Sequence, residues 1–158
     1  MKRQIAKGLT MLMLVVGLAL ASASVANGQS GKQVTAQVPF DFIVADKTLR
    51  SGQYQVSDAN SAGDALAIRS VGGKESVMRL TSETGSKAVK NSEAKLVFHR
   101  YNNTYFLVEV WMAGSSTGRE LPGTRQERAI ARELKAIAAY HGETKPVYEI
   151  VELIVTAR

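Results

Sequence analysis

Two apolar segments separated by three polar residues restrict the folds open to this chain of 158 residues. The segments are residues 95–101 and 105–112, and Asn102-Asn103-Thr104 lies between them. Asparagine tolerates the left-handed backbone of a tight turn, so the two segments are predicted to form a β-hairpin. A three-residue loop would pair Phe98 with Val108, Leu96 with Val110, Tyr101 with Tyr105, His99 with Leu107, and Lys95 with Trp111. Both faces of this hairpin are apolar, so both must be covered.

Further short β-like segments, separated by turn residues, recur along the chain. They comprise residues 38–44, 54–56, 65–69 and 77–81, together with a long β-branched run at 147–155. The polar residues 82–92 are expected to form an exposed loop. No alternation of strand and helix is present, which argues against a doubly wound parallel sheet.

One segment, residues 125–141, has the pattern of a helix. Thr124 and Glu127 form a capping box before it, and Gly142 is a suitable C-terminal cap. An apolar stripe recurs at helical spacing through Ile130, Leu134, Ile137 and His141. The sequence therefore predicts a mainly β fold: an antiparallel sandwich or small barrel of about seven strands, with one C-terminal amphipathic helix packed on it.

The N-terminal residues have the pattern of a secretory signal peptide. Lys2, Arg3 and Lys7 precede an apolar run at residues 9–21, which ends in small residues. We expect cleavage after Ala26, with Ala23 as the alternative, and export to the periplasm or the cell exterior. Residues 1–26 are then the signal peptide, 27–37 a flexible leader and 38–158 a single β-rich domain.

Composition limits the partners and the chemistry. The chain has no cysteine, so it holds no disulfide and no thiolate metal site. Loss of the three signal-peptide cations lowers the net charge from +6 to +3, which makes nucleic acid an unlikely partner.

Three blocks carry a family resemblance. They are VPFDFIVADKTLRSGQYQV at residues 38–56, KLVFHRYNNTYFLVEVW at 95–111 and GRELP at 118–122. Together they resemble a family of small exported bacterial proteins, frequent in acidobacterial genomes, without an assigned activity. Arg50 and Asn102 depart from the residues usual in that family, which has a small residue or proline and a glycine there. The resemblance implies export and no particular chemistry.

Catalytic and metal-binding patterns are weak. Residues 114–118 match G-x-S-x-G, with Ser116 as a hypothetical nucleophile, but no helix pattern follows as a hydrolase elbow requires. The only two histidines, His99 and His141, are expected to pack or cap rather than to bind metal. A glycosidase pair could be drawn from Asp41, Glu109, Glu120 and Glu149, yet no spacing selects two of them. We therefore predict no catalytic residues, no cofactor and no enzyme activity.

The helix breaks a local rule of charge placement. Arg125, Arg128, Arg132 and Lys135 recur three or four residues apart, so four cations share one face. Two of them lie in the first turn, where positive charge opposes the helix dipole. Carboxylates from the sheet or neighbouring loops pair with these cations, or the cations are simply solvated, or the face binds an anionic polysaccharide, a membrane surface or an acidic protein.

The leading hypothesis is thus a non-enzymatic binding or envelope-associated module with a basic helix face. A small barrel that holds an apolar ligand is the alternative, because the central hairpin is apolar on both faces. A serine hydrolase ranks third.

Overall fold

The fold was described from a computed structural model, which covers residues 33–73, 75–86, 93–142 and 146–155. All of these belong to the unit Gly31–Arg158. The expected signal peptide, residues 1–26 with its cleavage sites at Ala23 and Ala26, lies outside the described residues.

The smaller of two sheets contains four antiparallel strands in the order β1-β4-β5-β6. These strands are β1 (Gln33–Val38), β4 (Gly52–Asp58), β5 (Ala65–Ser70) and β6 (Ser76–Leu80). Strands β5 and β6 form a hairpin, and Gly72 between them adopts the positive φ of 78° that such a turn uses.

The larger sheet is built on the hairpin that the sequence predicted. Its order is β11-β8-β9-β10-β7. The strands are β7 (Ser82–Ser86), β8 (Ala94–Tyr101), β9 (Thr104–Trp111), β10 (Thr117–Glu120) and β11 (Glu149–Val155). Two three-residue strands join its side: β2 (Phe42–Val44) pairs parallel with β9 and antiparallel with β3 (Lys47–Leu49).

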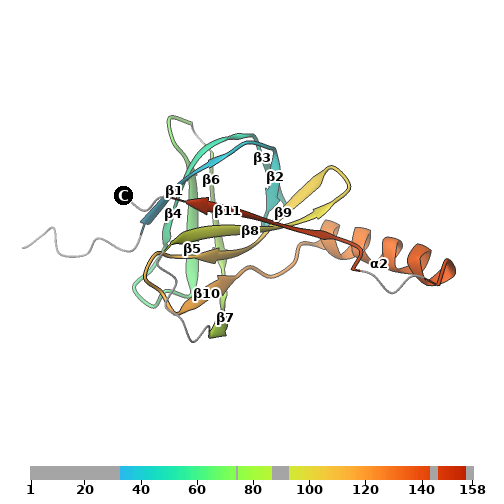
Figure 1. Ribbon diagram of the computed structural model, residues 1–158. Helices are drawn as coiled ribbons and strands as arrows, with labels where there is room; N and C mark the ends of the chain where they lie inside the picture. Colours follow the sequence, from blue (N-terminus) through green and yellow to red (C-terminus); the bar gives the residue numbers. More distant parts are fainter. Residues whose placement is uncertain (1–32, 74, 87–92, 143–145, 156–158) are drawn as a thin grey trace, which may run out of the picture. The chain divides into compact units, whose positions relative to one another are not determined.

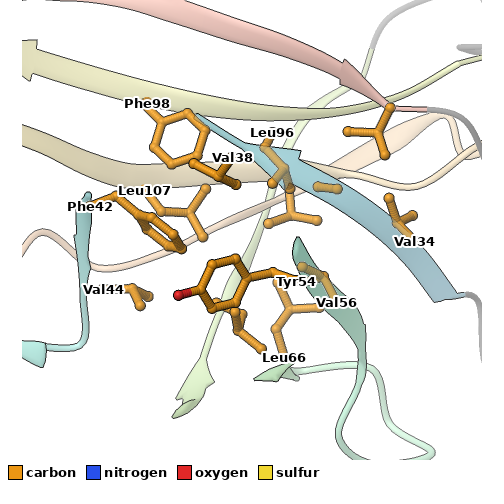
Figure 2. Packing of buried hydrophobic residues seen from close by; sticks show 14 of the residues in the cluster. Val34, Val38, Phe42, Val44, Tyr54, Val56, Leu66, Leu96, Phe98 and Leu107 are labelled. Atoms are coloured by element: carbon orange, nitrogen blue, oxygen red, sulfur yellow. The ribbon is translucent and has the colours of Figure 1, made fainter. Parts of the chain in front are cut away.

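The two sheets pack face to face as a sandwich (Figure 1). Figure 2 shows Tyr54, Val56 and Leu66 from the smaller sheet against side chains of the larger one. Their partners across the core include Leu96, Phe98 and Leu107. Each large side chain buried here contributes about 1.5–3 kcal/mol to folding. Within the described residues the sheets do not close into a barrel. Of the two predicted architectures, the structure therefore has the sandwich.

A second apolar cluster covers the opposite face of the β8–β9 hairpin. It contains Ile43, Val97, Tyr101, Phe106, Val108 and Trp111. Helix α2 (Arg125–Tyr140) packs on it through Ile130, Ala131 and Leu134, as the amphipathic stripe predicted. The stripe is not buried throughout, because Ile137 is 50% exposed and His141 is exposed as well. In Figure 1 the C-terminal half of α2 accordingly runs beyond the strands.

The hairpin register differs from the expected one over half its length. Lys95 pairs with Trp111 and Leu96 with Val110, as predicted, but an irregularity between Val97 and Phe98 then shifts the pairing by one residue. Tyr101 therefore faces Thr104, and the connection shortens to Asn102-Asn103. Asn102 adopts a φ of 54°, the left-handed conformation expected of it.

Three other expectations need correction. Residues 33–37 are not a flexible leader, because they belong to β1, where Val34 and Ala36 are buried in the core. Residues 82–86 are not a loop, because they form the edge strand β7 paired with β10. The segment 38–44 is two strands rather than one. These short pieces raise the strand count from about seven to eleven within the described residues.

Candidate functional site

Helix α2 begins where the sequence predicted, and its first turn binds acidic groups. The Thr124 hydroxyl accepts a hydrogen bond from the Glu127 amide at 3.0 Å. The Asp46 carboxylate, in the β2–β3 turn, accepts one from the Arg125 amide at 3.1 Å. Two acids therefore lie at the positive end of the helix dipole, which offsets the unfavourable cations there.

The capping box forms only in part. Thr124 caps the helix as expected, but Glu127 does not reach back to the Thr124 amide. Its Oε1 instead lies 2.9 Å from Nδ1 of His99 on β8. A carboxylate accepts hydrogen bonds, so His99 donates from Nδ1 and keeps Nε2 for other contacts. Glu127 thus fastens the helix to the large sheet rather than closing its own first turn.

The four cations of the helix remain exposed to solvent. Arg125, Arg128, Arg132 and Lys135 form no ion pair with any carboxylate in the part of the chain that the structure describes. The carboxylate that does come from the sheet, Asp46, binds a helix amide and not a guanidinium. At a rise of about 1.5 Å per residue the row is about 15 Å long. Of the alternatives, pairing with sheet carboxylates is therefore not what the described residues show, whereas exposure to solvent is.

A pocket of about 310 Å³ lies between the first turns of α2 and the outer face of the large sheet. Arg128 lines it, so the pocket adjoins the cationic face. The rest of its wall is His99, Tyr101, Val108, Glu120, Leu121, Gly123, Glu127 and Ala131. Cationic, anionic and apolar groups thus meet within one small volume.

The polar wall of this pocket is buried. Glu127 is 7% exposed and Tyr101 is 4% exposed. Burial, followed by the negative charge of Glu127, which also accepts a hydrogen bond from the phenol, raises the pKa of Tyr101 to about 12. The Tyr101 hydroxyl and the His99 imidazole therefore both contact the Glu127 carboxylate, and this arrangement holds α2 in one position on the sheet.

The two histidines have separate structural settings. The His99 ring lies on that of Tyr148, with centroids 4.0 Å apart. His141 follows the last turn of α2, where its amide bonds to the carbonyl of Ile137. Among the described residues, no group of three or more histidine, aspartate or glutamate side chains is placed to hold a metal ion.

Ser116 lies in an exposed connection between β9 and β10. The chain continues into strand β10 and not into a helix, so the geometry of a nucleophile elbow is absent from this described segment. Gly118 serves packing instead, because a Cβ there would lie 2.5 Å from Cε2 of Trp111.

The four carboxylates considered for glycosidase chemistry have different partners. Asp41 accepts from the Ser51 amide at 2.7 Å, Glu109 from the Trp111 indole at 2.8 Å, and Glu149 pairs with Arg100 at 3.2 Å. Glu120 lines the pocket under α2. The aromatic residues of the hairpin pack in the two apolar clusters. Nζ of Lys95 lies 5.6 Å from the centre of the Trp111 ring, at cation–π distance.

Sequence reasoning missed the contact between His99 and Glu127. The two residues are 28 positions apart and match no motif, so only the docking of the helix brings them together. Comparisons add no relative: no protein-family model, no curated protein and no solved structure matches the chain. In the described parts of the chain, no helix has the length and apolar character that a membrane crossing requires.

Proposed function

We propose that this protein is a non-enzymatic, exported binding module whose ligand is an anionic polysaccharide, held along the cationic face of α2. This face is Arg125, Arg128, Arg132 and Lys135. The observation that carries the proposal is that all four side chains are exposed while no carboxylate in the described residues neutralises them.

Such a row is unfavourable for folding by itself. Like charges three or four residues apart destabilise a helix by a few tenths of a kcal/mol per pair. The helix is held instead by its caps, by Glu127 and by the apolar cluster below it. Among the described residues, the four cationic side chains add no ion pair or hydrogen bond to that anchorage, so a binding role accounts for a charge pattern that stability does not.

The chemistry of the face favours a water-soluble polymer over a membrane. Membrane-surface helices insert an apolar face that lies opposite their charges, whereas the apolar face of α2 packs on the large sheet through Ile130, Ala131 and Leu134. The large apolar residues that this helix leaves exposed are Ile137 and Tyr140, both beyond the row of cations near the C-terminal end. A straight row of charges also suits a linear polyanion with regularly repeating groups.

Export rests on the N-terminal pattern of Lys2, Arg3 and Lys7 before an apolar run. N-terminal sequencing of protein recovered from its host tests this part. We expect mature protein that starts at Asn27 or at Ser24. Full-length protein retained in the cytosol would contradict export without affecting the binding proposal.

An apolar ligand has less support. The motive for it was a hairpin apolar on both faces, and the two clusters account for both faces. Phe98 packs into the sandwich core and Phe106 into the cluster beneath α2, each fully buried.

The test compares two double variants with the same net charge. Arg128→Gln with Arg132→Gln removes half of the cationic face, and Arg50→Gln with Arg69→Gln removes two exposed cations elsewhere. On immobilised heparin we expect the first variant to elute at clearly lower salt than the wild type. The second should elute close to the wild type.

Equal shifts for the two variants would show that net charge alone sets retention and would overturn the proposal. Vesicles with and without anionic lipid, and an acidic protein column, complete the experiment. Stronger binding to either of these than to heparin would reassign the face to a membrane or to an acidic protein.

A further inference from the structure

Strand β6 is an open edge of the smaller sheet. It pairs with β5 on one side and with no other strand among the described residues. The Ser70 amide bonds to the Glu75 carbonyl, and the Thr81 amide to the Asp64 carbonyl. Antiparallel hydrogen-bonded pairs alternate along a ladder, so the backbone groups of Val77 and Arg79 also face β5. Those of Ser76, Met78 and Leu80 therefore face outward.

The side chains of this edge are unusual for an unpaired strand. Met78 and Leu80 are 66% and 67% exposed, which places two large apolar residues on one face of the edge. On the other face Glu75 and Arg79 flank Val77, and neither has an ion-pair partner within the described residues. An unpaired edge with exposed apolar residues is a site for adding another strand.

We propose that two copies of this chain associate by antiparallel pairing of β6 with β6 of the second copy, centred on Val77. In this register Ser76 and Met78 of one copy exchange backbone hydrogen bonds with Met78 and Ser76 of the other. Glu75 of each copy then lies directly opposite Arg79 of its partner. The two smaller sheets become one continuous antiparallel sheet.

Charge complementarity selects this register. Only Ser76, Met78 and Leu80 present outward backbone groups, so the two-fold axis can pass through Val77, Met78 or Arg79. An axis at Arg79 would place two guanidinium groups opposite each other, which destabilises a strand pair. An axis at Met78 would leave Glu75 and Arg79 unmatched. Only the axis at Val77 forms two Glu75–Arg79 pairs, at positions where side chains approach most closely.

The contact is short, so the dimer should be weak. One five-residue strand and a few apolar side chains bury less than a standard interface. We expect a dissociation constant on the order of 10–100 µM, accessible to sedimentation equilibrium.

Charge exchange tests the register. Glu75→Arg alone, or Arg79→Glu alone, places like charges opposite each other twice and should weaken self-association by about tenfold or more. An equimolar mixture of the two variants restores both opposite-charge pairs in a heterodimer, and it should sediment like the wild type. Met78→Pro is the backbone control, because it removes an outward N–H without removing a bond to β5. It should be a folded monomer.

Each alternative result overturns the proposal. A wild type that stays monomeric at millimolar concentration excludes the dimer. A Met78→Pro variant that is folded and still dimeric assigns the contact to another surface. A mixture of the charge variants that fails to associate excludes the register through Val77.

Discussion

Replacing Glu127 with alanine should loosen α2 from the large sheet. Glu127 is 7% exposed, and both the His99 imidazole and the Tyr101 phenol contact its carboxylate. A hydrogen bond to a charged group contributes about 1.5–3 kcal/mol, and the 25% exposure of the His99 side chain places its share at the lower end. Tyr101 is left with a buried hydroxyl without its acceptor, at a cost of about 1 kcal/mol or more.

Two opposing effects reduce this sum. The variant no longer buries a carboxylate, which is itself costly, and alanine has a slightly higher helix propensity than glutamate. We therefore expect Glu127→Ala to lower the free energy of unfolding by about 2 kcal/mol. Glu127→Gln keeps the size and one acceptor and should lose about 1 kcal/mol.

Urea unfolding, followed by the fluorescence of the single tryptophan, measures this directly. Trp111 lies in the cluster beneath the helix and reports on its docking. Glu133→Ala is the matched control, because Glu133 is exposed on the same helix and should change stability by less than about 0.5 kcal/mol. A double-mutant cycle with His99→Ala should give a coupling of about 1–2 kcal/mol.

A Glu127→Ala variant as stable as the Glu133→Ala control would refute this reasoning. It would mean that the contact of Glu127 with His99 adds nothing to the docking of α2.

Two further predictions concern titration and packing. The folded state favours the neutral phenol of Tyr101, so the stability that Tyr101 contributes is complete below about pH 10 and is lost as the pH rises toward 12. Ultraviolet titration of the wild type and of Tyr101→Phe checks this. If the variant lacks a group that titrates near pH 10 in the wild type, the prediction is contradicted. Gly118→Ala places a Cβ against the Trp111 ring and should lower the free energy of unfolding by about 1–3 kcal/mol, measured by thermal unfolding. Gly52→Ala is the control and should cost less, because its Cβ meets only Tyr54 at 3.9 Å. Equal losses would show that the Trp111 contact is not what requires glycine.

The sequence predicts best where local patterns and burial agree. Helix α2 is found because its apolar spacing, the Thr124 cap and Gly142 all indicate the same boundaries. The β8–β9 hairpin is found because both of its strands are strongly apolar. In both cases the pattern is long enough to distinguish the helical period of 3.6 residues from the strand period of two.

Elements that lack such patterns are missed. Strand β7 is polar on both faces because it lies at an edge, and so it has no apolar alternation to detect. Strand β1 is missed for another reason: Val34, Ala36 and Val38 do alternate with polar residues, but the run is short and follows the small polar residues of the expected leader. The shift at Val97 and Phe98 depends on how β8 meets its neighbours, which no local signal encodes.

In the candidate site too, one part could be predicted from local sequence and another could not. The cationic face could be predicted, since spacing alone puts Arg128 and Arg132 on one side of a helix. The partners of Glu127 could not, because a capping box and a contact with the sheet use the same carboxylate. Tertiary packing decided between them, in favour of His99.

The proposed dimer would affect binding as well as assembly. Two copies joined through β6 carry two cationic faces, and a polymer long enough to reach both would bind more tightly than one face allows. The Met78→Pro variant separates these effects, because it should keep the affinity for a short oligosaccharide and lose only this gain.

The salt dependence of binding tests the role of the cationic face most directly. Affinity for a short heparin oligosaccharide is measured between about 50 and 300 mM salt, and the logarithm of the association constant is plotted against that of the salt concentration. At about 0.7 released counterions per neutralised charge, four contacts give a slope near −3, and Arg128→Gln with Arg132→Gln should reduce it to near −1.5. A slope near zero, or the same slope for both proteins, would show that the four cations of α2 do not hold the ligand.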